Sequence, residues 1–556
     1  MISVVDDRLS VNFERFGLEE YDVFLKTKTL PETAVEYDDV KETYRVTAPA
    51  RFAGHFGLQA PAPRKPWLPL PQSMHDYQAD LLRVALEAKR FAHWWDCGLG
   101  KCFEGLEWCR QVAHVTGGRV LVLTLKNLIS DVLEQAEKFY GDGGTRGRGD
   151  AGKLRLLVLR TRADLISFCK GPRDGAIGIT NFEKFVDQSE LKNSGMIREL
   201  SLLAGLWCDE SSILKAGGGV IKWNLMKSAR GIEYKLSTTA TPAPNDLMEY
   251  ASQAGFLEKI KTEQDVLWTY FQRDKAGKWT VKPWAIEAFY RFMASWSVYL
   301  RNPARYGYAD NLKSIPAPVF HTHQVPVTVD QLRRAEQIEG ETRGRGDAGT
   351  LASERKALGI VGRGKLAQLA RGFIYETSPS VPPLRGEGRT ARRVLSRKPG
   401  VVARLAERER AAGRQVLLWT EFDEESAILS ELLPDFEVLT GSIAEKERKP
   451  IIDRFKRGDC GGLITRAELL GFGQNFQNCT AQIVSGLTDS YEELYQMIRR
   501  SYRYGQSAVV HIHVPYVPEL EGAIYDNVMR KAANFEADTE QQEKYYVAAM
   551  KELRAA

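Results

Sequence analysis

Residues 96–102 read Asp-Cys-Gly-Leu-Gly-Lys-Cys and stand directly before a helical pattern at 103–115, which leads to an apolar run at 118–124. Glycines in such a loop let backbone N–H groups turn inward around phosphate, and the N-terminus of the next helix adds the positive end of its dipole. A lysine that ends the loop meets the β- and γ-phosphates of a nucleotide. The stretch therefore predicts a phosphate-binding loop whose residues are Gly98, Gly100, Lys101 and Cys102.

Two adjacent carboxylates, Asp209 and Glu210, follow an apolar run at 205–208. After a buried strand, such a pair can divide the work of phosphoryl transfer: one carboxylate holds Mg²⁺ and the other polarises the attacking water. A helix cap made by Asp209 and Ser211 is the structural alternative. Because the pair follows a phosphate loop at a suitable spacing, we expect Asp209 to hold Mg²⁺ and Glu210 to position water.

Near the C-terminal end of the chain, Arg500 and Arg503 stand three residues apart in a helical pattern. Arginines at this spacing share one side of a helix. They can reach across a cleft to phosphate charge, as arginine fingers do. A surface face of salt bridges is the alternative, but it does not explain the Gly505-Gln506 pair that follows.

Short β-branched runs alternate with helical patterns in two separate blocks, which is typical of parallel α/β layers. Their near-continuous apolar character suits sheets that are covered on both faces. The predicted strands are 118–124, 154–159, 176–180, 205–208 and 235–239 in the first block, and 416–420, 436–439, 462–465, 482–485 and 509–514 in the second.

The region between the blocks has a different composition. Phe289, Phe292, Met293 and Trp296 recur at helical spacing, so we expect a packed helical subdomain rather than a base-stacking platform. Residues 351–376 continue the helical pattern. The stretch 377–400 is rich in proline and arginine, and is either a solvated hinge or a strip that contacts phosphates.

Composition sets broad limits on function. Lys and Arg number 77 against 72 Asp and Glu, and the resulting charge of +5 permits a polyanionic partner without requiring one. The 7 cysteines are scattered without a C-x-x-C pair, which argues against a disulfide framework or a zinc knuckle. No signal peptide or membrane-length apolar run is visible, so we expect a cytoplasmic protein with no membrane partner. The repeated TRGRGDAG segments at 145–152 and 342–349 read as two exposed insertions.

The order of these motifs resembles that of the superfamily-two helicases. Among these helicases, the chain is similar to the Snf-type double-stranded DNA translocases. More specifically, it resembles the compact helicase-like proteins of tailed phages and prophages. The resemblance spans roughly residues 72–515. The further stretches that carry it are Tyr77-Gln78 (Q-motif), Leu121–Thr124 with Lys126 (motif Ia), Ile179–Glu183 (Ib), Lys215 after the acidic pair (II), Thr239–Asn245 (III), Leu439–Ser442 (IV), Thr465–Asn475 (V) and Gln496–Arg503 (VI).

This resemblance implies an ATP-dependent DNA translocase or helicase. Its ATP and Mg²⁺ would lie between two RecA-like lobes, and its partner would be duplex DNA bound through phosphates without sequence preference. Replication or recombination proteins of a phage or its host are possible partners. The implied nucleotide-binding residues are Gln78, Gly98, Gly100, Lys101, Cys102 and Gln496, and the implied DNA-contacting residues are Lys126, Asn181, Thr239, Thr241, Thr465 and Asn475.

The expected fold class is α/β. The expected domains are an N-terminal accessory module at 1–70, a first lobe at 71–255, a helical insertion and basic linker at 256–395, and a second lobe with a C-terminal helical tail at 396–556.

Several residues depart from the family pattern. Cys102 stands where the family has a threonine or serine whose hydroxyl binds Mg²⁺, and a thiol is a poor ligand for that hard cation. Arg499 stands where motif VI has glycine, Ala240 replaces a glycine of motif III, and Glu468-Leu469 replace small residues of motif V. Two other functions therefore stay open: a nucleotide-binding DNA scaffold with weak or no turnover, and an RNA helicase.

Overall fold

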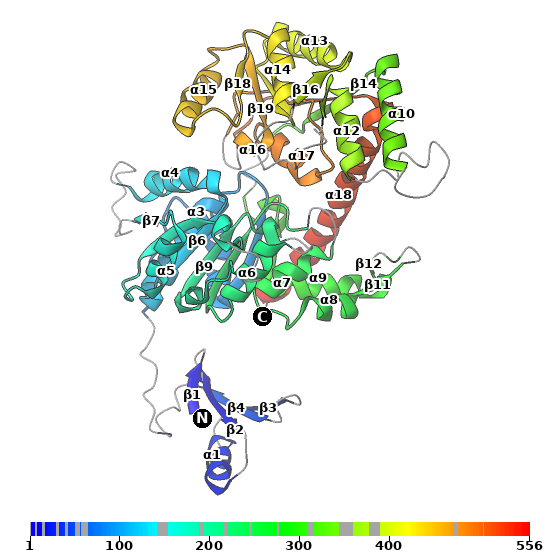
Figure 1. The fold of residues 1–556 in the computed structure, drawn as a ribbon. Helices are drawn as coiled ribbons and strands as arrows, with labels where there is room; N and C mark the ends of the chain where they lie inside the picture. The colour runs from blue at the N-terminus through cyan, green and yellow to red at the C-terminus, as the bar shows by residue number, and fades with distance from the viewer. Residues whose placement is uncertain are drawn as a thin grey trace.

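The fold was analysed in a computed structural model of the chain (Figure 1). The structure describes residues 2–5, 8–13, 17–28, 33–38, 43–49, 56, 65–141, 154–187, 194–214, 219–243, 247–274, 277, 279–309, 315–343, 360–376, 390–470, 475–503 and 505–555. Among these residues, no helix combines the length and the apolar character needed to cross a membrane.

The first lobe is built on a parallel sheet of seven strands. Helices pack on its faces, so its central strands are buried along their whole length. In spatial order the strands are β13 (Ser297–Leu300), β5 (Arg90–Trp95), β10 (Tyr234–Thr238), β9 (Gly205–Asp209), β6 (Val120–Thr124), β8 (Ile177–Asn181) and β7 (Leu156–Val158). Its helices include α2 (Asp76–Ala88), α3 (Lys101–Thr116), α4 (Ile129–Tyr140), α5 (Arg162–Lys170) and α6 (Val220–Ser228).

The second lobe is built on a parallel sheet of six strands. In spatial order these are β14 (Val319–Gln324), β21 (His511–Tyr516), β20 (Ala481–Val484), β17 (Val416–Thr420), β19 (Gly462–Arg466) and β18 (Glu437–Leu439). Its helices include α13 (Lys398–Ala411), α14 (Asp423–Leu432), α15 (Glu445–Arg457), α16 (Ala467–Leu470) and α17 (Tyr491–Ile498). The predicted α/β class with two RecA-like parallel-sheet lobes is confirmed, and all ten predicted strands form.

The segment between the lobes differs from the expected helical insertion, because two of its strands belong to the lobes. Strand β13 pairs with β5 in the first sheet, and β14 pairs with β21 in the second. The helices of this segment are α7 (Glu249–Phe256), α8 (Glu263–Tyr270), α9 (Ile286–Ala294), α10 (Val329–Arg343) and α12 (Ile360–Ala370). Two hairpins complete it: β11 (Phe271–Arg273) with β12 (Trp279–Val281), and β15 (Phe373–Glu376) with β16 (Thr390–Arg393).

The apolar face of α9 is packed as predicted. Phe289 and Met293 are fully buried, and Trp296, which lies just beyond the helix, is 1% exposed. Trp268 and Trp284 behave differently, since 71% and 76% of their surfaces are exposed. Helical packing therefore accounts for only part of the aromatic residues in this region.

In the described part of the basic linker, two of the basic side chains have acidic partners. Lys398 is buried and donates to Glu521 at 2.7 Å, and Arg393 pairs with Glu431 at 2.6 Å. Residues 377–389 lie outside the described residues, as do all of the first TRGRGDAG segment and 344–349 of the second. The continuous helix expected over 351–376 is also not observed, because α12 ends at Ala370 and is followed by β15.

The C-terminal helix α18 (Pro518–Ala555) contacts both lobes, whereas the sequence suggested only a tail on the second lobe. Val528 and Phe535 belong to an apolar core of the second lobe, and Tyr546 belongs to the core of the first. Figure 1 shows this helix, in red, running from the second lobe down along the first. It therefore joins the two lobes along one side of the molecule.

The N-terminal module forms a four-stranded antiparallel sheet with one helix. Its elements are β1 (Ile2–Val5), β2 (Arg8–Phe13), α1 (Leu18–Lys28), β3 (Ala34–Asp38) and β4 (Thr43–Pro49), with the strand order β1-β2-β4-β3. Its small apolar core contains Leu9, Val11, Phe13, Val46 and Ala48.

Candidate nucleotide-binding site

A cavity of about 480 Å³ lies between the two lobes. The first lobe contributes the loop after β5, the start of α4 and the end of β9, and the second lobe contributes α17 and the residues that follow it. Sequence-predicted residues that line this cavity are Gln78, Gly98, Gly100, Lys101, Cys102, Asp209, Glu210, Asn475, Gln496, Arg500 and Arg503.

The phosphate loop has the backbone that its glycines predict. Gly98 and Gly100 adopt φ angles of 90° and 81°, in the left-handed region that favours glycine. A Cβ atom at Gly100 would come within 2.2 Å of the Gln78 side-chain nitrogen, so a larger residue there would displace the Gln78 amide. Lys101 begins α3 and donates from Nζ to the Trp95 carbonyl at 2.9 Å. Loop, helix N-terminus and lysine thus fit a nucleotide phosphate.

Gln78 and its neighbour Tyr77 support this loop from α2. The Gln78 Nε2 and the Tyr77 hydroxyl both donate to the Leu99 carbonyl at 2.9 Å, and the Gln78 Oε1 accepts from the His75 N–H at 2.9 Å. Gln78 therefore holds the loop in place, whereas its expected contact with the nucleotide stays a prediction.

The two carboxylates lie at the carboxyl end of β9, between its sheet neighbours β6 and β10. The Thr124 hydroxyl donates to Asp209 Oδ2 at 3.1 Å, and the Thr238 hydroxyl donates to Asp209 Oδ1 at 2.9 Å. Glu210 adopts a φ angle of 51°, in the left-handed region that favours glycine. Carboxylate oxygens are the ligands Mg²⁺ prefers, so Asp209 is suited to hold that ion.

Burial raises the pKa of both carboxyl groups, and the charge of Asp209 adds to the shift at Glu210. Burial raises the pKa of Asp209, although hydrogen bonds from Thr238 and Thr124 and the charge of Lys101 oppose this. Burial and the Asp209 charge raise the pKa of Glu210 to about 7. A carboxyl group with a pKa near the working pH can accept and release a proton, which suits a residue that acts on water.

The arginines of the second lobe face this arrangement from across the cleft. Arg500 is buried, which lowers its pKa to about 10, while Cys97, Glu210 and Asp131 favour its charged form. Arg503 donates to the side-chain oxygen of Asn475. The predicted arginine pair therefore lies at the cavity rather than on a surface salt-bridge face.

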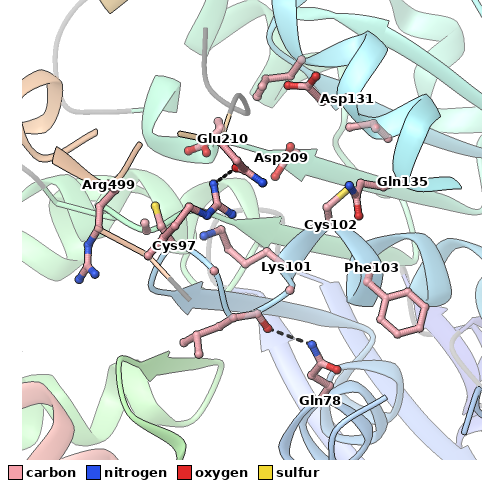
Figure 2. Close-up of a pocket in the computed structure, with 18 of the residues that line it drawn as sticks. Gln78, Cys97, Lys101, Cys102, Phe103, Asp131, Gln135, Asp209, Glu210 and Arg499 are labelled. Carbon is pink, nitrogen blue, oxygen red and sulfur yellow. Dashed lines mark hydrogen bonds between the residues drawn. The ribbon is translucent and has the colours of Figure 1, made fainter. Parts of the chain in front are cut away.

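A third arginine, Arg499, forms an ion pair with Asp96 of the first lobe. The sequence identified Arg499 only as a departure from the family pattern, and it did not single out Asp96 as a partner. The Tyr495 hydroxyl also donates to Asp96. Figure 2 shows Lys101 between Arg499 on one side and Cys102 with Asp131 on the other.

Cys102 lies in the first turn of α3, facing the cavity. Burial, with the nearby charges of Asp209 and Asp131, raises the pKa of this thiol well above its usual value. Burial also raises the pKa of Asp131, on α4, to about 6. The side chain at the position expected to bind Mg²⁺ is therefore a neutral thiol, with a second carboxyl group close by.

The residues predicted to contact DNA divide into two groups. Lys126 is exposed, and Asn475 is exposed at the cavity. Asn181, Thr239, Thr241 and Thr465 are instead buried, so a direct DNA contact does not fit them in this structure. Pro244, Asn245, Lys215 and 471–474 lie outside the described residues.

The buried residues Thr239 and Thr241 link Glu210 to the second lobe. The Thr239 hydroxyl donates to Glu210 at 3.4 Å, and the Thr241 hydroxyl donates to Glu492 of α17 at 3.2 Å. A further contact between the lobes runs from the Asn127 amide to the Glu468 carbonyl at 3.4 Å.

The second lobe matches a known family: the helicase conserved C-terminal domain family covers residues 397–505. No curated protein matches the chain. Among solved structures, the chain is similar to the Sulfolobus solfataricus SWI2/SNF2 ATPase core in complex with dsDNA, with a TM-score of 0.37 and 17% identity over 82% of this chain and 90% of that chain. It is also similar to the Sulfolobus solfataricus SWI2/SNF2 ATPase core domain, with a TM-score of 0.35 and 16% identity over 82% of this chain and 90% of that chain.

Proposed function

We propose that this chain is an ATP-dependent DNA translocase or helicase, which hydrolyses ATP in the cleft between its lobes and moves along duplex DNA. The observation that carries the proposal is the single cavity lined by Lys101 and the Asp209–Glu210 pair of the first lobe and by Arg500 of the second. The helicase C-terminal domain match at 397–505 supports the same function.

The first lobe binds and activates the nucleotide in this proposal. Lys101 moves from the Trp95 carbonyl to the β- and γ-phosphates, while backbone N–H groups of the loop surround them. Asp209, oriented by Thr124 and Thr238, holds Mg²⁺, which neutralises phosphate charge when bound. Glu210 orients the attacking water and accepts its proton.

The second lobe completes the site. Arg500 and Arg503 stabilise the charge that develops on the transferred phosphoryl group, so hydrolysis requires the lobes to be together. The Thr241–Glu492 hydrogen bond joins the two lobes. Thr239, two residues before Thr241, donates a hydrogen bond to Glu210 within the first lobe. A change at the phosphates is thereby linked to lobe movement, and lobe movement carries the protein along the DNA backbone.

DNA is bound mainly through its phosphates, and therefore without sequence preference. The exposed Lys126, which follows β6, makes such a contact in this proposal. The buried members of the predicted DNA set act indirectly, by connecting the nucleotide cleft to the exposed surface.

A second candidate function is a DNA scaffold that binds nucleotide without rapid turnover. The observation that favours it is Cys102, because a neutral thiol replaces the hydroxyl expected to bind Mg²⁺. The other parts of the site do not discriminate between the two functions.

Nucleotide hydrolysis measured with no nucleic acid, single-stranded DNA, duplex DNA and RNA separates these functions. A translocase on duplex DNA is expected to be stimulated most by duplex DNA, and Lys101→Ala is expected to abolish the activity. Lys170→Ala, at an exposed position on α5, is the matched control. Stimulation by RNA alone would identify an RNA helicase, and nucleotide binding without turnover under all conditions would identify the scaffold.

A further inference from the structure

The ion pair between Arg499 and Asp96 crosses the cleft at the phosphate loop. An Arg499 Nη atom contacts the Asp96 carboxylate, and the two side chains are only 12% and 8% exposed. The Asp96 charge raises the pKa of Arg499 against the effect of burial. Both side chains are largely withdrawn from water, so removing either one leaves the other buried without its partner.

Both partners make further contacts that hold them in place, and one of these, from Tyr495, also crosses the cleft. The Asp96 Oδ1 accepts from the Cys97 N–H at 2.7 Å and from the Tyr495 hydroxyl. The Arg499 guanidinium lies over the rings of Tyr495, at 5.2 Å, and Tyr502, at 4.6 Å. An ion pair between groups with fixed orientations sets a distance and a direction between the elements that carry them.

The elements that the pair connects carry the groups proposed to act on phosphate. Asp96 immediately precedes the phosphate loop, and its carbonyl accepts from Lys101 Nζ at 3.3 Å. Arg499 immediately precedes Arg500. The ion pair is thus one residue from the loop on one side and one residue from the predicted arginine finger on the other.

We propose that Arg499 is a positioning residue, whose ion pair with Asp96 holds the second lobe in register with the phosphate loop so that Arg500 faces the phosphates. This inference rests on the proposed hydrolysis of nucleotide in the cleft and assigns a role to a residue that departs from the family pattern. Glycine at this position has no side chain that could reach Asp96. Arg499 lines the same cavity, and in this proposal it acts through the position of the second lobe.

The surroundings of Asp96 offer no equivalent substitute for Arg499. Of the other nearby cations, Lys101 donates to the Trp95 and Asp96 carbonyls. Arg301, which follows β13, is bound in a two-pronged pair to Glu536 of α18 at 2.7 and 3.0 Å. Because Arg301 already has this partner, loss of Arg499 is expected to leave the lobes connected at Asp96 by the Tyr495 hydrogen bond alone, and so less firmly held in register.

The first test is a double-mutant cycle on the steady-state kinetics of nucleotide hydrolysis with duplex DNA. Arg499→Ala and Asp96→Asn are each expected to lower kcat on the order of 10²-fold, because a small misplacement of Arg500 is enough to do so. The KM for ATP is expected to stay within about threefold of wild type. The double variant is expected to be no more than about threefold worse than either single variant, and Arg499→Lys is expected to recover part of kcat.

Arg410→Ala is the matched control, because Arg410 pairs with Asp435 at 2.5 Å entirely within the second lobe. It is expected to leave kcat and KM near wild type. Independent, additive losses from Asp96→Asn and Arg499→Ala would overturn the inference, and so would a parallel loss of nucleotide affinity and thermal stability.

The second test does not depend on hydrolysis. Hydrogen–deuterium exchange of the full chain, measured without nucleotide, is expected to be faster in the peptides that cover 96–100 and 491–503 in Arg499→Ala, and unchanged in Arg410→Ala. Unchanged exchange in Arg499→Ala would overturn the inference even if the chain hydrolyses ATP. Faster exchange in a chain without hydrolysis would instead contradict the proposed function and leave the lobe contact established.

Discussion

The Tyr290 hydroxyl on α9 donates a hydrogen bond to the carboxyl group of Asp538 on α18. The Tyr250 hydroxyl donates to the other carboxyl oxygen at 3.4 Å. Near the start of the same helix, Glu521 accepts from Lys398 at 2.7 Å in the second lobe. The C-terminal helix is therefore attached to each lobe by buried or partly buried polar groups, and Asp538 lies at its attachment to the first.

The stability of this attachment is expected to depend on pH. Burial raises the pKa of Asp538 to about 7, although the bonds from Tyr290 and Tyr250 oppose the shift. Between its unfolded pKa near 4 and its folded pKa, the folded state keeps a proton that the unfolded state has lost, so stability falls as pH rises through this window. Asp538→Asn removes the titration and keeps an oxygen that can accept from Tyr290.

We expect Asp538→Asn to be more stable than wild type at pH 8, by about 1–2 kcal/mol, and no more stable at pH 4. This expected gain is smaller than the free energy that the whole pKa shift would give, because the Asp538 carboxyl group keeps partial contact with solvent. Denaturant unfolding at both pH values measures the difference. Asp526→Asn, on an exposed position of the same helix, is the control, and an equal stabilisation of Asp538→Asn at pH 4 and pH 8 would contradict the argument.

Arg500 and Arg503 are expected to differ in their effect on turnover. Arg500 is buried and faces Glu210, whereas Arg503 is bound to Asn475. We therefore expect Arg500→Ala to lower DNA-stimulated turnover by roughly 10³ and Arg503→Ala to lower it less. Affinity for ATP is expected to stay within a few-fold in both, as measured with a fluorescent nucleotide. Loss of nucleotide binding in parallel with turnover would show that the arginines maintain the fold of the cleft.

Binding to duplex DNA is expected to weaken steeply with salt and to depend little on base sequence. Each Lys or Arg contact with phosphate releases counterions, so the logarithm of affinity should fall linearly with the logarithm of salt concentration. Fluorescence anisotropy on two duplexes of unrelated sequence measures both properties. Lys126→Ala is expected to reduce the salt slope by about one. A flat salt dependence, or a strong preference for one duplex, would rule out movement along the backbone by phosphate contacts.

The strands that the sequence revealed are those with apolar runs between clear turns, such as Gly205–Asp209 and Val416–Thr420. Strand Arg90–Trp95 was missed because it follows α2 without a glycine or proline signal. Lys89 connects α2 to this strand with a φ angle of 60°. Such a positive φ angle is normally adopted by glycine, so a lysine at this position gives no turn signal in the sequence. Strand Ser297–Leu300 was missed because its partner, β5, lies about two hundred residues earlier in the chain.

The local motifs of the site could be predicted from the sequence, because each consists of a few neighbouring residues. These motifs are the loop at 96–102 and the Asp209-Glu210 pair. The residues that orient them come from elsewhere in the chain. Thr124 and Thr238 end the two strands beside β9, and parallel strands bring such ends to one edge of a sheet, so the sheet order would have identified them. Asp96 and Arg499 are separated by 403 positions, and no periodic pattern connects them.

Cys102 stands at the position where the family pattern has a hydroxyl that binds Mg²⁺. In a catalytic cleft, Mg²⁺ would be held by Asp209, water and the nucleotide, because a neutral thiol adds little to the shell of a hard cation. Cys102→Thr places a hydroxyl of similar size at the same point of α3. It is expected to lower the Mg²⁺ concentration for half-maximal hydrolysis and to leave DNA affinity unchanged.

Cys102→Ala tests whether the Cys102 thiol takes part in hydrolysis or only fills its position. Because little coordination is lost with the sulfur, this variant is expected to keep turnover and Mg²⁺ dependence within about threefold of wild type. Hydrolysis titrated with Mg²⁺ at saturating ATP and duplex DNA measures all three proteins. A large loss in Cys102→Ala would show that the sulfur takes part directly. If wild type is inert at saturating Mg²⁺ and Cys102→Thr gains no activity, the absent hydroxyl is not what limits turnover, and the nucleotide-binding scaffold becomes the better account of this cleft.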